Sequence, residues 1–546
     1  MLTGDTLGAC LTQLARRYPG AAAVFPPADE RTTAGDVQVA ATGAAHAFRA
    51  AGVAPGAVVG VLMLPAARLL TSLFGLWRAG AAVSILPMQT GFGNEEAAAR
   101  RLARIARAAG MRHLVIDAGF QGIGAALRTA MPELTLLDPP AGGSVSTKPL
   151  PEVPPEALAV VQFTSGSTSH PKGVMLSHRT MVAGLTAVVV SGRLTPEDVI
   201  VQWVPTFHDM GLVGLMSSWL NGSDVHVFTP TAFLRRPAAV LEHFAAAGGT
   251  ILSGPNFSYD YLLDAVRPER LAALDLSRWR LAFNGSEPVS ADTVERFAAI
   301  LAPYGVGPSV MYPVYGMAEA TLAVAFPEPG TVPRIVTVDR DELSSTGVVR
   351  QRTGGKRVLS VGRAVHGVQL RIVAPDGVPV GEGRLGEIQI SGPSLTTGYY
   401  REFEATRQLF DGSWLRTGDL GFRLDADLFV TGRRKEMVVV RGQNFFPDDV
   451  ESIAREVPGV YRRRCVAFSD VDADGTEHVG VIVEATGTSD ELRREVARRI
   501  SAELDLAAVR VHVVRPRWLT RTTSGKWQRG LASHRLAAER AAAMEG

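Results

Sequence analysis

The chain has 546 residues, 46% of them hydrophobic and 20% charged, with a formal net charge of +2 at pH 7. That length exceeds one ordinary hydrophobic core, so at least two domains are expected in a globular protein. The nearly balanced charge gives no general reason to expect a nucleic-acid partner.

The sequence carries no signal for crosslinking, export or membrane insertion. Its two cysteines, Cys10 and Cys465, leave no basis for a disulfide framework or a cysteine metal site. The first 20 residues lack the basic segment followed by an apolar one that marks a signal peptide. The most apolar region, residues 57–86, is broken by proline and arginine into pieces shorter than the roughly 20 residues of a bilayer span. We therefore expect a cytoplasmic protein without a membrane span.

From residue 1 to about 320, short apolar runs alternate with alanine-rich helical stretches. The runs include "AVVGVLML", "HLVIDA" and "VHVFTP", and "NEEAAARRLARIARAAG" is one of the helical stretches between them. This alternation is typical of βαβ units and predicts mostly parallel sheets with helices, an α/β fold.

A polar, flexible stretch, "TSGSTSHPKG" at residues 164–173, directly follows the apolar run "LAVVQF". Glycine-freed backbone amides, hydroxyl groups and the Lys172 ammonium together suit a polyanion such as a nucleotide triphosphate. The stretch does not match the pattern GxxxxGK[ST], because Lys172 precedes its glycine. A phosphate cradle of another kind is the functional interpretation, and a surface connection is the alternative.

Further polar stretches interrupt the apolar pattern before residue 320. "WVPTFHDMGL" sets His208 among apolar residues, and "FNGSEP" and "YGMAEATL" each end a strand-like run with glycine and a carboxylate. Taken singly, a core histidine or an ordinary turn explains each of them. Their occurrence in this order indicates a functional site.

The pattern changes again in the second half of the chain. Residues 327–356, rich in proline, glycine and charge, have strand-like ends that favour an ordered hairpin, and an ordinary surface insertion is the alternative. Short strands with glycine turns follow to about residue 430 and predict an antiparallel sheet or small barrel. Within them Asp419 stands between glycines, where an ordinary turn is the alternative. A compact α+β segment follows Gly432, and in it Lys526 lies on a Gly-Ser turn, where solvation is the alternative.

In combination these segments resemble the adenylate-forming superfamily of acyl-CoA synthetases, luciferases and nonribosomal-peptide adenylation domains. "WVPTFHDMGLVG", "GPNFSYDYLLDAV", "FNGSEPVSADTVERF", "YGMAEATLAV", "VRGQNFFPDDVE" and the extra segment after Leu322 are more similar to the fatty acyl-AMP ligases than to the acyl-CoA ligases. The resemblance implies a large N-terminal domain, residues 1–431, of two mostly parallel sheets plus a small β-barrel. It also implies an insertion at about 327–356, which restricts the small domain, and a smaller mobile α+β domain at 432–546.

The resemblance also implies nucleotide-binding roles at matching positions. ATP would be held by the phosphate-loop residues Thr164, Ser165, Gly166, Ser167, Thr168 and Lys172, and by the adenine-binding residues Gly285, Ser286, Glu287, Pro288, Tyr315, Gly316 and Met317. Asp419 would accept hydrogen bonds from the ribose hydroxyls, with Arg433 as a further ribose or phosphate contact. Glu319 would hold Mg²⁺, which prefers hard oxygen ligands.

Other implied roles concern the reaction itself. Lys526 would be the catalytic residue of adenylation, because an ammonium offsets negative charge that grows in the transition state. Glu319 and His208 would act beside it, the latter near the acyl carboxylate. Lys435 would be the hinge on which the small domain rotates. The implied acyl pocket has four candidate wall residues, namely Phe207, Asn256, Phe257 and Tyr261.

The resulting hypothesis is a ligase that uses ATP and Mg²⁺ to convert a fatty acid to an acyl-adenylate, releasing pyrophosphate. The acyl group would then pass to a phosphopantetheinylated acyl carrier protein in trans, in natural-product biosynthesis. An acyl-CoA synthetase using free CoA is the alternative enzyme, and a catalytically weak acyl-binding protein is the alternative from another class.

Overall fold

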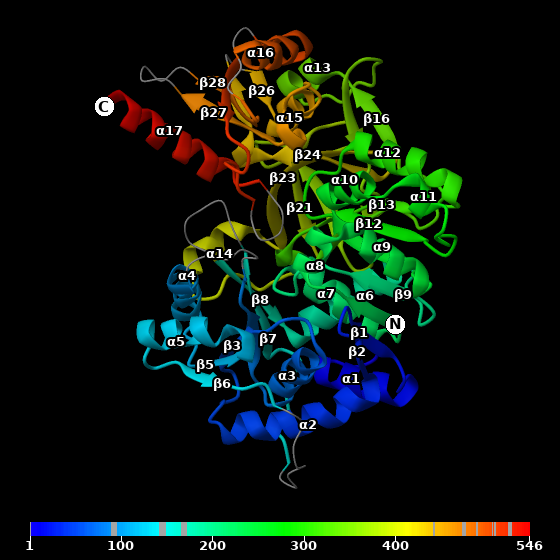
Figure 1. The fold of residues 1–546 in the computed structure, drawn as a ribbon, viewed down its shortest axis with the longest axis vertical. Helices are drawn as coiled ribbons and strands as arrows, with labels where there is room; N and C mark the ends of the chain where they lie inside the picture. Colours follow the sequence, from blue (N-terminus) through cyan, green and yellow to red (C-terminus); the bar gives the residue numbers. More distant parts are fainter. Residues whose placement is uncertain are drawn as a thin grey trace. The chain divides into compact units, whose positions relative to one another are not determined.

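The computed structural model (Figure 1) describes residues 2–88, 95–140, 149–164, 172–440, 443–471, 477–487, 490–504, 506, 509–521 and 527–545. Its internal contacts divide the chain into two compact units. Unit 1 comprises Met1–Pro333, Val361–Leu370 and Ile390–Leu415, and unit 2 comprises Arg334–Ser360, Arg371–Gln389 and Arg416–Gly546. The sequence analysis expects a single domain boundary between residues 431 and 432, and this boundary stays a prediction.

The first sheet of unit 1 has six strands in the order β6-β5-β3-β4-β7-β8. They are β3 (Val58–Leu62), β4 (Ala82–Ile85), β5 (His113–Ile116), β6 (Thr135–Leu137), β7 (Leu158–Thr164) and β8 (Lys172–Ser177). All pairs are parallel except β7–β8, which is antiparallel. Among the helices between these strands are α3 (Ala67–Arg78), α4 (Glu95–Ala108) and α5 (Gln121–Ala130). Every residue of β3 is buried, as its continuous apolar run predicts for a strand covered on both faces.

The second sheet of unit 1 has seven strands in the order β13-β12-β11-β9-β10-β1-β2. They are β1 (Ala22–Phe25), β2 (Glu30–Thr33), β9 (Val199–Gln202), β10 (Asp224–Val227), β11 (Ile251–Pro255), β12 (Leu281–Gly285) and β13 (Met311–Pro313). Only the β1–β2 pair is antiparallel. The two sheets confirm the expected α/β class with mostly parallel strands.

The helices of the remaining part of unit 1 are α1 (Leu7–Arg17), α2 (Ala34–Ala50), α6 (His178–Ser191), α7 (Asp209–Leu220), α8 (Pro230–Arg235), α9 (Pro237–Ala246), α10 (Asn256–Ala265), α11 (Pro268–Leu271), α12 (Ala291–Leu301) and α14 (Phe403–Leu409). A small antiparallel sheet joins β14 (Tyr315–Gly316), β15 (Ala323–Phe326) and β18 (Arg363–Ala364). The one-turn helix η3 (Ala318–Ala320) lies between the first two of these strands and carries Glu319.

A further sheet of six strands has the order β20-β19-β21-β23-β22, with β24 beside β23. Its strands are β19 (Gln369–Val373), β20 (Pro379–Val380), β21 (Gly386–Ser391), β22 (Phe410–Asp411), β23 (Trp414–Leu424) and β24 (Asp427–Arg433). This order is open at both ends, and the expected small barrel is not confirmed.

The segment predicted to be an insertion is ordered. Its strand-like ends pair antiparallel as β16 (Ile335–Val338) and β17 (Lys356–Leu359), with α13 (Arg340–Thr346) between them. Their apolar side chains pack on the stacked rings of Phe422 and Phe429, whose centroids are 5.1 Å apart. The segment therefore has its own core contacts within unit 2.

The last part of unit 2 is the α+β segment expected after Gly432. Its strands are β25 (Val438–Val440), β26 (Gln443–Phe445), β27 (Cys465–Val471), β28 (Glu477–Glu484) and β29 (Val509–Val514), and its helices are α15 (Pro447–Arg455), α16 (Asp490–Leu504) and α17 (Arg529–Glu545). The strands β27-β28-β29 form one sheet, and α15 and α16 contribute to the core that covers it. Among the described helices of both units, none is long and apolar enough to cross a membrane.

Candidate active site

The first predicted site residues lie where β7 ends and β8 begins. Thr164 is the last residue of β7 and Lys172 the first of β8, and the two residues are paired across the strands. The Thr164 hydroxyl donates to the Lys172 carbonyl at 3.5 Å. The other four predicted phosphate-loop residues, Ser165, Gly166, Ser167 and Thr168, lie outside the described residues. The two ends of the predicted loop are therefore held side by side by strand pairing.

A tyrosine that the sequence analysis missed connects two of the predicted residues. The Lys172 ammonium lies 4.9 Å from the ring centroid of Tyr399, and the Tyr399 hydroxyl donates to the Glu319 carboxylate at 2.8 Å. A cation over an aromatic face is attracted by the negative face of the ring. One side chain thus joins an ammonium to a carboxylate. The family resemblance assigned the ammonium to the ATP phosphates and the carboxylate to Mg²⁺.

Hydrogen bonds to backbone carbonyl groups hold Tyr399 and Glu319 in this arrangement. The Thr396 amide donates to the Glu319 carbonyl at 2.8 Å, and the Thr396 hydroxyl donates to the Met175 carbonyl at 2.7 Å. The Tyr400 amide donates to the Gly173 carbonyl at 2.7 Å. The segment 396–400 therefore runs along β8 and also holds η3. Gly398 within it has φ +138°, and a Cβ there would collide with the Thr406 side chain.

The predicted adenine-binding residues also come together. Gly285 ends β12, and a Cβ at this glycine would lie 2.8 Å from the Val314 side chain, next to Tyr315 in β14. Ser286 has a left-handed φ of 65°, which turns the chain sharply at the end of β12. Pro288 and Met317 continue the same two segments, and Gly316 packs closely on the Leu322 carbonyl. The end of β12 therefore lies beside the start of β14, because β14 follows β13, the parallel partner of β12.

Glu287 connects this edge to the predicted acyl pocket. Its carboxylate accepts from the Phe257 amide at 2.6 Å, in the first turn of α10. Such amides have no partner inside the helix, so an acceptor carboxylate stabilises the helix end. The buried Asn256 donates to the Thr293 hydroxyl at 3.1 Å and accepts from the Ser290 amide at 3.1 Å. These hydrogen bonds join the start of α10 to the start of α12, so Asn256 has a structural role.

Two of the other predicted pocket residues, Phe257 and Tyr261, belong to a run of aromatic rings. Phe257 packs edge-on against Trp203, which stacks on Phe233 at a centroid distance of 4.0 Å. Phe233 in turn lies 6.3 Å from Tyr261. The Phe207 and His208 rings are 4.7 Å apart, and His208 is the residue before α7. Trp203 and Phe233 were not predicted, because a buried aromatic residue carries no sequence signal that distinguishes a pocket wall from ordinary core.

The predicted ribose-binding residues lie in unit 2 and bind each other. Asp419 on β23 and Arg433 on β24 are cross-strand partners, and the Arg433 Nε lies 3.0 Å from the Asp419 carboxylate. The Asp419 side chain is buried, whereas about half of the Arg433 side chain is exposed. The predicted hinge residue Lys435 follows in the exposed turn η4 (Arg434–Glu436).

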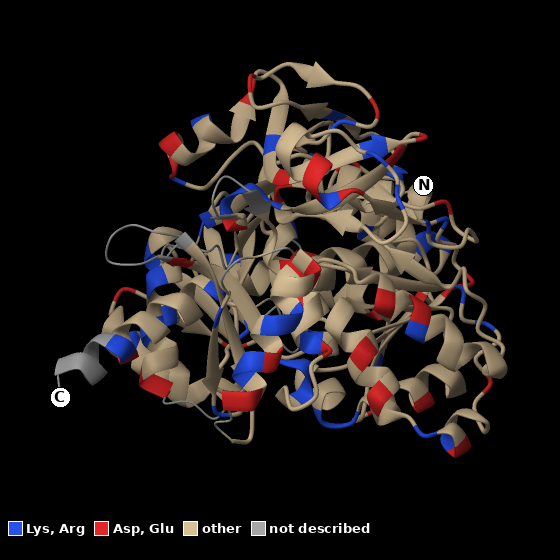
Figure 2. Cartoon of the chain, turned by 90° about the horizontal axis from the view of Figure 1, so that it is seen from above, with Lys and Arg blue, Asp and Glu red and all other residues tan. Residues whose placement is uncertain are grey.

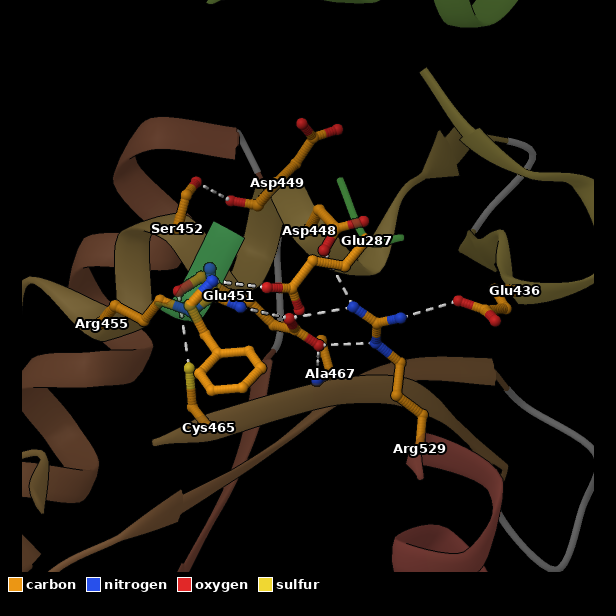
Figure 3. Close-up of polar contacts among 11 residues, drawn as sticks. Glu287, Glu436, Asp448, Asp449, Glu451, Ser452, Arg455, Cys465, Ala467 and Arg529 are labelled. Atoms are coloured by element: carbon orange, nitrogen blue, oxygen red, sulfur yellow. Dashed lines mark hydrogen bonds and ion pairs between the residues drawn. The ribbon is translucent and has the colours of Figure 1, made fainter. Parts of the chain in front are cut away.

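Lys526 lies outside the described residues, but the helix that follows it is firmly anchored. Arg529, the first residue of α17, binds three carboxylates from α15 and η4 (Figure 3): Glu451 and Glu436 at 2.7 Å each and Asp448 at 2.9 Å. Although burial lowers it, these carboxylates raise the pKa of Arg529 above its usual value. The guanidinium therefore stays charged and ties the start of α17 to the turn that contains Lys435.

Comparison with known proteins gives concordant matches. Residues 11–400 match the family described as AMP-binding enzyme. The chain is 34% identical over 401 residues to the medium-chain-fatty-acid–[acyl-carrier-protein] ligase JamA of Moorena producens, covering 69% of this chain and 68% of that protein. It is 32% identical over 412 residues to the ligase of the same description, TtuA, of Teredinibacter turnerae, covering 71% and 64%.

A solved structure shares the whole fold. It comes from structural and functional studies of fatty acyl-adenylate ligases from E. coli and L. pneumophila, and it has 29% sequence identity to this chain. The TM-score is 0.90, and the match covers 98% of each chain.

Proposed function

The chain belongs to the AMP-binding enzyme family, and from this premise we propose that it activates a fatty acid with ATP and transfers the acyl group to an acyl carrier protein. The observation that carries the proposal is the group formed by Lys172, Tyr399 and Glu319 at the start of β8. It presents an ammonium and a carboxylate at the end of the polar stretch between β7 and β8. Both relatives named as acyl-carrier-protein ligases support the acceptor.

Two steps make up the proposed reaction. An oxygen of the fatty-acid carboxylate attacks the α-phosphorus of ATP, the bond to the bridging oxygen breaks, and pyrophosphate leaves. The thiol of the phosphopantetheine arm then loses its proton and attacks the acyl carbonyl, and AMP leaves with the electron pair of the broken C–O bond. Lys172 offsets phosphate charge, and Lys526 contributes an ammonium where charge grows in the first transition state.

The donor set fits a magnesium ion that arrives with the nucleotide. In the described part of the chain, no group of three or more His, Cys, Asp or Glu residues could hold a metal by itself. Mg²⁺ bound to nucleotide needs only one or two protein carboxylates, because phosphate oxygens and water complete its shell. Glu319 would supply that carboxylate, and the ion would neutralise charge on the leaving pyrophosphate.

The remaining assignments concern the ribose of ATP and the acyl chain. Asp419 would accept hydrogen bonds from the ribose hydroxyls, with Arg433 holding its carboxylate in position. The aromatic run that includes Phe257 would line the acyl chain, which gains from burial against apolar rings. Free CoA as the acceptor is the alternative, and the cytoplasmic location stays a prediction.

The decisive experiment has two stages. ATP–pyrophosphate exchange is measured with a series of fatty acids, including dodecanoate, and we expect exchange that depends on the acid. Acyl transfer from the adenylate is then compared for free CoA and for phosphopantetheine-loaded carrier protein, and we expect product only with the carrier. Exchange without any fatty acid, or none with any acid, would contradict adenylation. Abundant acyl-CoA would contradict the assigned acceptor.

A further inference from the structure

The outer face of α4 concentrates arginine. Arg100, Arg101, Arg104 and Arg107 are exposed, whereas Leu102, Ile105 and the alanines of the opposite face are buried. Residues three and four apart share one face of a helix. The four side chains therefore form a basic stripe along about 10 Å of helix, given a rise of roughly 1.5 Å per residue. They line a surface hollow of about 470 Å³.

The charge of this stripe is only partly neutralised. Arg100 pairs with Glu96 at 3.7 Å, with both side chains well exposed, and Arg107 donates to the Ala130 carbonyl at 2.6 Å. Within the part of the chain that the structure describes, no carboxylate pairs with Arg101 or Arg104. Basic and acidic residues are interspersed along the ribbon in Figure 2, in keeping with a net charge of +2. The stripe is thus a local departure from that balance.

A second segment extends the stripe with one more cation and an apolar contact. The Arg401 guanidinium packs closely against Gly110, just past the end of α4. If Gly110 carried a Cβ, that atom would lie 2.7 Å from the two terminal nitrogens of Arg401. Tyr400 packs on the same core as α4, and α14 begins three residues after it. Phe403, the first residue of α14, has 88% of its surface exposed. Acidic Glu404 on this helix pairs with Arg407.

This surface begins close to the candidate active site. Arg401 is two residues from Tyr399, so their Cα atoms are no more than about 7 Å apart. Tyr399 itself binds Glu319 and contacts Lys172. A molecule seated on the stripe would therefore sit within a short reach of the place where the acyl-adenylate is proposed to form.

We propose that the arginine stripe of α4, together with Arg401 and Phe403, docks the carrier protein through its acidic face. The inference rests on the proposed function and adds to it the surface that selects the acceptor. A small acidic protein matches the stripe in charge and can span its length, and an apolar side chain on that protein would cover Phe403. A long phosphopantetheine arm can then reach inward past Tyr399. Complementary charge of this kind acts mainly on encounter and is weakened by salt.

The test reverses charge on the stripe and on a matched control helix of the same unit. Arg101→Glu/Arg104→Glu is compared with Arg16→Glu/Arg17→Glu, which makes the same charge change at two exposed positions of α1. The probe is the best wild-type acceptor from a panel of phosphopantetheine-loaded carrier proteins. We expect kcat/KM for the carrier to fall at least tenfold in the α4 variant only, with ATP–pyrophosphate exchange within twofold of wild type.

Further measurements separate the possible failures. Wild-type transfer should weaken as salt is raised, the α4 variant should lose most of this dependence, and Phe403→Ser should lower kcat/KM several-fold. Unchanged transfer in the α4 variant would overturn the docking surface while leaving the proposed function standing. Inhibition of carrier transfer by free CoA that occurs in the wild type and is lost in the α4 variant would show that the stripe binds a phosphate group rather than the protein, which also overturns the proposal. Absence of exchange in the wild type would instead remove the proposed function itself.

Discussion

At the scale of single residues, the least expected finding is Tyr399, whose hydroxyl binds Glu319 while its ring faces Lys172. The sequence "TTGYYREF" gives no sign of this, because the contact joins residues 80 and 227 positions apart. We regard Tyr399 as a positioning residue that keeps the carboxylate oriented before the nucleotide binds. A hydrogen bond to a charged group contributes roughly 1.5–3 kcal/mol, which is about ten- to a hundred-fold in an equilibrium constant.

Tyr399→Phe should therefore raise the Mg²⁺ concentration needed for half-maximal pyrophosphate exchange by about tenfold or more. The ring over Lys172 is retained in this variant, so the KM for fatty acid should stay near its wild-type value. Tyr400→Phe removes a hydroxyl from the neighbouring, core-packed ring and serves as the matched control. Identical Mg²⁺ dependence in wild type and Tyr399→Phe would rule out this role for the phenol.

Lys526 is a residue-scale prediction that depends on sequence alone. Lys526→Ala should lower ATP–pyrophosphate exchange by about 10²–10³-fold, because one preorganised contact to the transition state is lost. ATP binding, measured by calorimetry, should change little, since the proposed ground-state contacts lie elsewhere. Exchange within a few-fold of wild type would show that the lysine has been assigned wrongly.

At the scale of elements, the segment between β16 and β17 is bound to the last part of the chain. Lys356, at the start of β17, pairs with Asp449 of α15 at 3.0 Å, and both side chains are almost fully buried. Its ammonium also lies 4.3 Å from the ring centroid of Phe446, and Arg340 of α13 donates to the Glu503 carbonyl at 3.3 Å. That this segment restrains the movement of the C-terminal region and so limits the acceptor stays a prediction.

Replacing residues 340–355 by Asn-Gly should remove α13 and preserve the β16–β17 pair, because the paired strand ends need a short turn. We expect adenylation to be intact and acyl-CoA, measured by chromatography at saturating CoA, to rise from near zero. A bias of only about 1.4 kcal/mol changes a population ratio tenfold, so a modest contact is enough. The control is Val348→Ala, which leaves α13 in place; acyl-CoA that stays at background in the replacement variant would contradict the restraint.

The same element shows what local sequence could have revealed. Residues 339–347 contain an N-cap aspartate, with Glu342 three residues later, and end in Gly347 with φ 68°, which is the pattern of a capped helix. The capping residues were visible, but the short polar segment between two strands was interpreted as part of a hairpin. Seven residues give little periodicity, and this is why α13 was missed.

At the scale of the whole molecule, the apolar pattern predicted mostly parallel sheets and the antiparallel region, because apolar period and turn residues are local properties. The fold then brings several of the motifs together, where β7 pairs with β8 and where the end of β12 lies beside the start of β14. The sequence did not reveal which side chains meet across long separations, such as Tyr399 with Glu319 or Lys356 with Asp449. Such contacts depend on packing between elements, which no single stretch of sequence encodes.

Unit 2 is built from separate stretches of the chain, and this has a consequence for chimeric enzymes. The unit draws on three stretches, and Arg334–Ser360 and Arg416–Gly546 share the Lys356–Asp449 ion pair. Exchanging only the C-terminal stretch with that of a homologue would leave the buried Lys356 ammonium without its partner wherever the homologue has no carboxylate at the position of Asp449. Removing one partner of a buried pair costs about 3–5 kcal/mol. A functional swap then has to transplant Arg334–Ser360 together with the C-terminal stretch, although residues 361–415, which include the third stretch of the unit, separate the two in sequence.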